Sequence, residues 1–331
     1  MKEYLTEQLE ETAQHIIEPP SSKKTRVSII KLFHELEDAI EQDLWEHQEH
    51  ITTPKGSCIA PVEAAHCMLD TERTTIFIQG IYAAIKTLQE KHPYKTLSIA
   101  YMGCGPFATL ALPLTHHFSS QEIQFTLVDI QEGALQCVQK LIEQLDLTEY
   151  FPTIVHHDAA TYTPSSTPDL VISEAMGRAL LYEPQLAISE NAKQFASDST
   201  IIIPQEISLS VLLHKTKNDH RRPVDLGTFF TVSKDTPTTD PDHIIEGDVT
   251  LKDNLHSDLP YHVCIATRVR VFQSHVLHPD DSLITHREPL NRRYKKQPNE
   301  TAFHLQYPSG STEEQIRLEV RDASNKITRL L

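Results

Sequence analysis

Cysteine and glycine are scarce in this sequence. Its 331 residues include five cysteines and nine glycines, and no two cysteines stand in a Cys-x-x-Cys pair. Cysteines scattered in this way favour neither a structural zinc site nor a disulfide framework. The sequence also lacks an apolar run of roughly 18 to 20 residues, the length that spans a bilayer, and its start lacks the apolar segment of a signal peptide. We therefore expect a cytoplasmic protein that binds no membrane.

Positive charge is scarce as well. Lysine and arginine number 30 against 46 aspartates and glutamates, which gives a net charge of -16. Nucleic-acid binding depends on basic side chains that neutralise phosphates, so this composition argues against an RNA or DNA partner. An acidic surface instead attracts cationic ligands. The 19 histidines include the adjacent pairs His116-His117 and His156-His157, but adjacent side chains point in different directions, so we expect no metal site.

The pattern of apolar residues divides the chain into three parts. Residues 1–95 show helical spacing and are predicted to form an N-terminal helical cap. Strand-like and helical segments alternate over residues 96–205, with one helix near residues 109–114, and this alternation predicts a Rossmann-like, doubly wound parallel sheet. Residues 206–331 contain short strand-like runs divided by Pro, Asp, Asn and Ser, which predict an antiparallel β domain, either a barrel or a sandwich. The expected fold is therefore α/β with a second, antiparallel β domain.

Two glycines stand where the first strand of the parallel sheet is expected to end. The segment Gly103-Cys104-Gly105 follows residues 96–102, and glycines let the backbone approach a ligand that a Cβ atom would exclude. Asp129 ends the next strand, 24 residues after Gly105, where a carboxylate can hydrogen-bond both ribose hydroxyls. A nicotinamide dinucleotide needs a third glycine beside its pyrophosphate, but Phe107 and Ala108 follow here. S-adenosylmethionine has a ribose and no phosphates, so it does not need that glycine.

Glu174 and Glu183 stand nine positions apart and form the most informative pattern in the chain. Residues 168–173 read as a buried strand, so Glu174 is predicted at a carboxyl end of the sheet, the edge where such sheets bind ligands. If the following loop folds back, two carboxylates surround one cation. A guanidinium suits them, because its planar set of donors matches carboxylates two at a time.

The residues around these glutamates support a family resemblance. The segment Ser173-Glu174-Ala175-Met176-Gly177, together with Leu180-Leu181 and Glu183, resembles the double-glutamate loop of the protein arginine methyltransferases. That family transfers a methyl group from S-adenosylmethionine to a guanidino nitrogen. The resemblance covers roughly residues 60 to 290. It implies a class I methyltransferase fold, S-adenosyl-L-methionine as cofactor, a homodimer, and a β domain that serves substrate binding and dimerisation.

The resemblance also implies residues that bind the cofactor. Arg73, in the helical segment of residues 68–74, would hold the cofactor's carboxylate, and Asp158 would hold the adenine. The sequence departs from the family pattern at Tyr101, where an acidic residue is usual, and at Phe107, where a glycine is usual.

Catalytic roles follow from the same resemblance. Glu174 and Glu183 would orient the guanidinium and draw its positive charge toward themselves, while Met176 would crowd the site. His286 resembles the histidine of the family's Thr-His-Trp loop and would pair with Asp70, acting as a relay or an orienting group.

Two further departures concern the substrate. Ala175 and Arg287 stand where the family has tryptophan, so an aromatic wall is lost and a cation is gained. Free arginine has a carboxylate that Arg287, or Arg178 inside the glutamate loop, can pair with, whereas peptide-linked arginine has none. We therefore expect an S-adenosylmethionine-dependent N-methyltransferase acting on a guanidino group, most favourably that of free L-arginine or a related small molecule. The alternatives are a protein arginine N-methyltransferase and a non-catalytic scaffold with the same fold.

Overall fold

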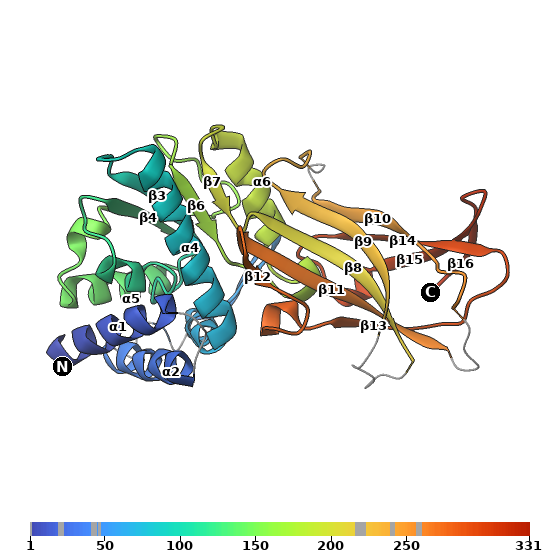
Figure 1. Cartoon of the computed structure of the whole chain (residues 1–331), viewed down its shortest axis with the longest axis horizontal. Helices are drawn as coiled ribbons and strands as arrows, with labels where there is room; N and C mark the ends of the chain where they lie inside the picture. Colours follow the sequence, from blue (N-terminus) through green and yellow to red (C-terminus); the bar gives the residue numbers. More distant parts are fainter. Residues whose placement is uncertain are drawn as a thin grey trace.

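A five-stranded parallel sheet forms the centre of the first half of the chain (Figure 1). The computed structural model describes residues 2–18, 23–40, 45, 48–215, 223–238, 242–255 and 260–331. In spatial order the strands are β5 (Thr153–His156), β4 (Ile123–Asp129), β3 (Leu97–Met102), β6 (Leu170–Ser173) and β7 (Ile201–Ile203). The chain runs outward from β3 to β5 and then returns to β6 on the other side of β3. The strand order therefore reverses between β3 and β6, and ligands bind at such a point in open α/β sheets.

Six α-helices are described. They are α1 (Lys2–Ile17), α2 (Lys23–Asp38), α3 (Pro61–His66), α4 (Thr71–Lys91), α5 (Glu132–Gln144) and α6 (Gln185–Phe195). Short 3₁₀ turns lie at η2 (Cys67–Leu69), η3 (Leu112–His116), η4 (Thr148–Tyr150), η5 (Arg178–Leu180), η6 (Leu283–Thr285) and η7 (Glu313–Gln315). No helix among these described residues is both long enough and apolar enough to cross a membrane.

The second half of the chain forms two antiparallel sheets. One contains β8 (Glu206–His214), β9 (Val224–Ser233), β11 (Tyr261–Phe272), β12 (His275–Leu277) and β13 (Glu288–Tyr294); the other contains β10 (Ile244–Thr250), β14 (Glu300–Pro308), β15 (Arg317–Asp322) and β16 (Ile327–Leu330). The two sheets meet where Gly247 lies against the Phe229 carbonyl, so closely that a Cβ atom at residue 247 would be 1.8 Å from that oxygen. The predicted fold class, a doubly wound parallel sheet followed by an antiparallel β domain, is confirmed.

Helix α4 joins the two halves. Asp70 begins it, accepting a hydrogen bond from the Arg73 N–H (3.4 Å), and the helix then runs beside β11. At Gly80 a Cβ atom would be 2.6 Å from Cγ1 of Val271, so the absence of a side chain lets helix and strand pack closely. Figure 1 shows α4 between the parallel sheet and the β domain.

Two local features differ from the sequence analysis. The helix expected near residues 109–114 is a turn followed by the shorter η3. Ala108 lies in the left-handed region (φ +42°) and Pro113 has no N–H to donate to residue 109, so an α-helix does not form over this span. The second difference is a short hairpin, β1 (Ile51–Thr53) and β2 (Gly56–Cys58), in the part predicted to be helical.

The departure at Phe107 has a packing explanation. Its ring is fully buried, with centroids 5.9 Å from Phe33 and 5.7 Å from Trp45. Phe33 belongs to α2, so Phe107 attaches the N-terminal helices to the loop after β3. A glycine there would leave a cavity the size of a phenyl ring.

Candidate active site

A cavity of about 180 Å³ lies at the carboxyl ends of β3, β4 and β6. It contains both glutamates, both glycines of the loop after β3, and the carboxylates predicted to bind a cofactor. Residues from the N-terminal part (Cys58, Ile59, Cys67) and from the β domain (Leu283, Ile284) also line it. Three separate parts of the chain therefore enclose one site. Within the described residues, no cluster of three or more His, Cys, Asp or Glu side chains is arranged to hold a metal ion.

The loop after β3 leaves room beside the Asp129 carboxylate. Gly103 and Gly105 have φ values of +77° and +64°, which side chains rarely tolerate. One oxygen of Asp129 accepts the Gly105 N–H (2.8 Å) and the other accepts the Gln131 N–H (2.9 Å). Burial raises the pKa of Asp129, and these two N–H donors oppose the rise. A carboxylate has about four acceptor sites, so Asp129 can still accept hydrogen bonds from ligand hydroxyls.

Two other predicted ligand-binding residues lie along the same wall. Asp158 lines the cavity at the carboxyl end of the sheet and accepts the Ala160 N–H (2.8 Å). Cys104 is buried there, and burial raises the pKa of its thiol well above the ordinary range. Cys104 is therefore a neutral, apolar part of the wall at pH 7.

Glu174 is paired with Arg73. Arg73 Nη1 lies 2.8 Å from Glu174 Oε2, and the two side chains are only 7% and 10% exposed. Arg73 also donates to the Cys67 carbonyl. Burial raises the pKa of Glu174, and the guanidinium of Arg73 opposes that rise. A buried guanidinium thus already occupies one side of this carboxylate, and the other side faces the cavity.

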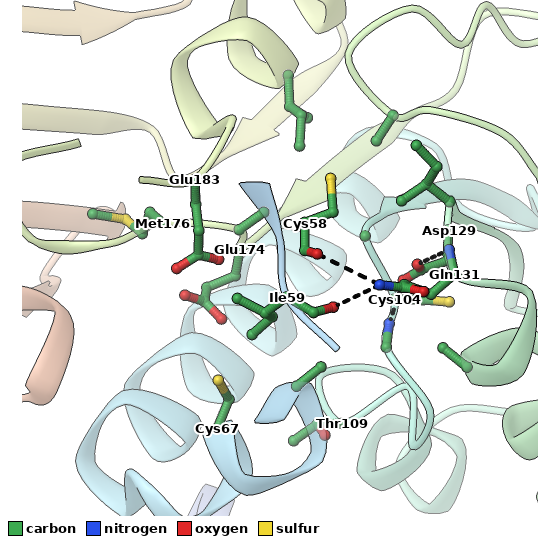
Figure 2. Close-up of a pocket in the computed structure, with 18 of the residues that line it drawn as sticks. Cys58, Ile59, Cys67, Cys104, Thr109, Asp129, Gln131, Glu174, Met176 and Glu183 are labelled. Carbon is green, nitrogen blue, oxygen red and sulfur yellow. Dashed lines mark hydrogen bonds between the residues drawn. The ribbon is translucent and has the colours of Figure 1, made fainter. Parts of the chain in front are cut away.

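Glu183 has no such partner. Its carboxylate lines the cavity, and it forms no side-chain hydrogen bond or ion pair within the described ranges. Burial and the nearby charge of Glu174 raise the pKa of Glu183 to about 8. Figure 2 shows the two carboxylates beside each other, with Met176 next to Glu183. This arrangement favours a cationic ligand, because a positive charge between the glutamates would relieve their repulsion.

The loop that carries the glutamates is held in an unusual conformation. Ala179, Leu180 and Tyr182 all lie in the left-handed region, with φ values of 55°, 56° and 68°. Such residues cost free energy and persist where the surroundings hold them. The β domain does so: Thr267 accepts the Ala179 N–H (3.0 Å), and Tyr307 donates to the Ala179 carbonyl (2.9 Å).

The glycine of the loop is explained by the same fold. A Cβ atom at Gly177 would lie 2.5 Å from the Leu181 carbonyl oxygen, so the tight turn of the loop requires glycine. Gln185 then fixes the loop from inside, accepting the Ala175 N–H (2.9 Å) and donating to Ser173 (2.9 Å). Glu174 and Glu183 therefore converge because both ends of their loop are anchored.

The predicted pair of Asp70 and His286 is wrong. Asp70 instead accepts the Leu283 N–H (2.8 Å) and caps α4. His286 is exposed, lies outside the cavity, and hydrogen-bonds nothing in the described part of the chain. The turn η6 brings Leu283 and Ile284 to the cavity, and His286 follows it on the solvent side. The β domain does fold back onto α4, but Asp70 is met by the Leu283 backbone N–H and not by a histidine side chain.

Arg178 and Arg287 do not line the cavity, contrary to the prediction that they pair with a substrate carboxylate. Arg178 is 43% exposed and lies 3.2 Å from Glu288. Arg287 lies 2.8 Å from Asp280. Each guanidinium is therefore held by a carboxylate of the β domain, and in the described residues Arg73 is the only lysine or arginine that lines the cavity.

Sequence reasoning missed several residues that hold the site together, among them Gln131, Gln185, Thr267 and Tyr307. None of them belongs to a recognisable motif. Gln131 had the clearest local signal, because it stands two positions after Asp129 and directly before α5. The other three contact the glutamate loop from elements whose position depends on the whole fold.

Comparison with known proteins bears on the fold. No family model and no curated protein sequence matches this chain. Among solved structures, a chain of the Trypanosoma brucei PRMT1 enzyme–prozyme heterotetrameric complex with AdoHcy is similar, with a TM-score of 0.55 and 15% identity over 80% of this chain and 95% of that one. Arabidopsis thaliana protein arginine methyltransferase 10, solved in an open conformation, gives a TM-score of 0.48 and 11% identity over 77% and 93%. The first likeness shows that the present chain shares the fold of that PRMT1 chain.

Proposed function

We propose that this protein is an S-adenosylmethionine-dependent N-methyltransferase that acts on a guanidino group. The observation that carries the proposal is the pair of buried carboxylates, Glu174 and Glu183, of which one has no cationic partner among the described residues. Support comes from the fold, which is shared with a chain of a PRMT1 complex whose ligand is AdoHcy. The non-catalytic alternative has no use for an unpartnered carboxylate kept buried in a cavity.

The residues of the cavity fit the cofactor. Asp129 would accept the two ribose hydroxyls, the left-handed glycines 103 and 105 would let the cofactor approach the backbone, and Asp158 would bind the adenine amino group. Arg73 would hold the cofactor's carboxylate with the N–H groups that Glu174 does not use. The cofactor supplies a methyl group on a positively charged sulfur, ready for in-line displacement.

The glutamates would align the acceptor. A guanidinium is protonated at pH 7, and two carboxylates fix its plane and attract its positive charge. The remaining nitrogen would then have a larger share of the electron density, and it would release one proton to solvent as it takes up the methyl group. Alignment and electrostatic stabilisation are the main contributions that an enzyme can make to this displacement. Met176 narrows the cavity beside Glu183 and limits how the acceptor can turn.

We further propose that the guanidino group belongs to arginine within a peptide. The expectation of free arginine depended on Arg178 and Arg287, and both are paired with carboxylates outside the cavity. A free amino acid brings its α-carboxylate close to the acidic site, and burying an unpaired charge is costly. Arg73, the one basic side chain lining the cavity in the described residues, would be engaged by the cofactor and Glu174.

A labelled-methyl assay tests this function. With labelled S-adenosylmethionine, we expect methyl transfer to an arginine-containing peptide, and a kcat/KM for free arginine that is at least tenfold lower. Arginine amide, which lacks the carboxylate, should fall between the two. Mass spectrometry locates the methyl group. Efficient methylation of free arginine alone would restore the small-molecule alternative, and no transfer to any guanidine would contradict the proposed function.

The pKa of Glu183 leads to a pH dependence. Its folded-state value of about 8 lies above the ordinary 4.5, so the unliganded protein holds this proton at pH 7. The stability that the protonated group contributes is complete below pH 4.5 and is lost as the pH rises through about 8. A guanidinium must displace that proton, so we expect peptide affinity to rise about tenfold per pH unit up to about pH 8 and then level off.

Calorimetry in buffers of different ionisation heats measures this effect. One proton should be released per bound arginine peptide at pH 7, and Glu183→Gln should abolish both the release and the slope. An affinity that stays constant from pH 6 to 8 would mean that Glu183 is already ionised in the free protein.

A further inference from the structure

Gln131 fastens the N-terminal segment across the cavity. Its Nε2 donates to the carbonyls of Glu49 (2.9 Å) and Ile59 (3.1 Å), with a longer contact to the Cys58 carbonyl (3.5 Å). The residue is only 4% exposed. We call residues 48–60 the strap. The side chain of one buried glutamine thus binds the strap near both of its ends.

The strap forms part of the cavity wall. Cys58 and Ile59 line the cavity, and Figure 2 shows them between the glutamates and Gln131, with the hydrogen bonds to Gln131 as dashed lines. The backbone N–H of Gln131 donates to Asp129, the carboxylate proposed to hold the ribose. Gln131 therefore contacts both Asp129, at the proposed cofactor site, and the strap.

The tip of the strap, residues 55–57, contacts the glutamate loop. Ser57 N–H donates to the Tyr182 carbonyl (2.7 Å), one residue before Glu183. Gly56 has a φ of +137°, and a Cβ atom there would be 2.8 Å from that same carbonyl oxygen. Gly310 of the β domain packs against Lys55 even more closely, with 2.3 Å from its Cβ position to the Lys55 carbonyl oxygen. The tip of the strap is held by backbone contacts on two sides, whereas its two ends depend on Gln131.

We propose that Gln131 is a positioning residue that keeps the strap closed over the bound cofactor and so sets how long the cofactor stays. This inference rests on the proposed function and adds a residue that acts on the cofactor through the strap. Without the Nε2 donors, the carbonyls of residues 49 and 59 accept hydrogen bonds from water in place of Gln131, and the strap opens on the cofactor side. Its tip stays attached to the glutamate loop, so the alignment of the acceptor is preserved.

Dissociation of S-adenosylhomocysteine tests the proposal. We expect Gln131→Leu and Gln131→Glu to raise its dissociation rate at least tenfold and to raise the KM for S-adenosylmethionine, with kcat within twofold of the unmutated enzyme. Gln131→Glu keeps the shape of the side chain but places acceptors against the strap carbonyls. The matched control is Gln144→Leu, because Gln144 also donates to a carbonyl of the N-terminal part, that of Ala39 (3.3 Å), but outside the cavity. It should leave the dissociation rate within twofold.

Hydrogen exchange gives a second readout that needs no variant. Amides of residues 48–60 in the unmutated protein should exchange at least tenfold more slowly when S-adenosylhomocysteine is bound. An unchanged dissociation rate in both Gln131 variants, an equal rise in Gln144→Leu, or unchanged exchange in the strap would overturn the proposal. If S-adenosylhomocysteine binds the unmutated protein in these experiments, the proposed cofactor stands whatever the strap does. If it does not bind, both ideas fail.

Discussion

Glu174→Gln and Glu183→Gln are each expected to lower kcat/KM for an arginine peptide by two to three powers of ten or more. Each substitution leaves a buried guanidinium with one carboxylate where it needs two, and losing one partner of a buried charge pair costs about 3–5 kcal/mol. At 1.4 kcal/mol per factor of ten, that cost corresponds to this loss of rate. Steady-state kinetics with labelled cofactor measures the effect.

The matched control is Glu63→Gln. Glu63 contributes to the electrostatic environment of Glu183 but is exposed and contacts His50 (2.9 Å), so its loss should change kcat/KM less than twofold. Binding of S-adenosylhomocysteine should survive in all three variants, since none of these carboxylates is proposed to hold the ribose or the adenine. Near-normal turnover in Glu174→Gln or Glu183→Gln would return that glutamate to a structural role.

Arg73→Leu is expected to lower the free energy of unfolding by about 3–5 kcal/mol, because it leaves the buried carboxylate of Glu174 without its cation. The same variant should bind S-adenosylmethionine much more weakly. The cofactor's carboxylate would have no cation to pair with in the described part of the cavity. Chemical denaturation measures the first effect, and calorimetry measures the second.

A double variant separates stability from binding. Arg73→Leu with Glu174→Leu removes both charges, so much of the lost stability should return while cofactor binding stays weak. If the free energy of unfolding of the single variant falls by less than about 1 kcal/mol, the pair contributes no more than a solvated surface ion pair does. That result would mean that Arg73 and Glu174 are not paired in a buried site.

Most of the fold could be predicted from the sequence, because the spacing of apolar residues within a helix or strand is a local property. Buried strands such as residues 170–173 and the alternation of strands with helices appear directly in the order of apolar residues. The hairpin β1–β2 was missed because its strands have only three residues each and contain Gly, Ser and Thr. Short segments of this kind have no period that can be recognised.

The sequence predicted those site residues whose position follows from their residue type and from the end of a strand. Glu174 follows β6 and Asp129 ends β4, so both were expected at the carboxyl edge of the sheet. His286, Arg178 and Arg287 were placed by motif alone, and their positions depend on how the β domain docks. The ion pairs of the two arginines with Asp280 and Glu288 could not be predicted from the sequence. The homodimer and the cytoplasmic location remain predictions.

Helix α4 makes the two halves of the chain inseparable. Its buried residues include Phe77, Ile78 and Ile81, and it packs against β3 and β6 on one side and β11 and β12 on the other. A fragment ending at residue 205 would expose the face of α4 at Gly80 that β11 covers, together with the glutamate loop that Thr267 and Tyr307 hold. We therefore expect the parallel sheet to be less stable in a fragment that lacks the β domain.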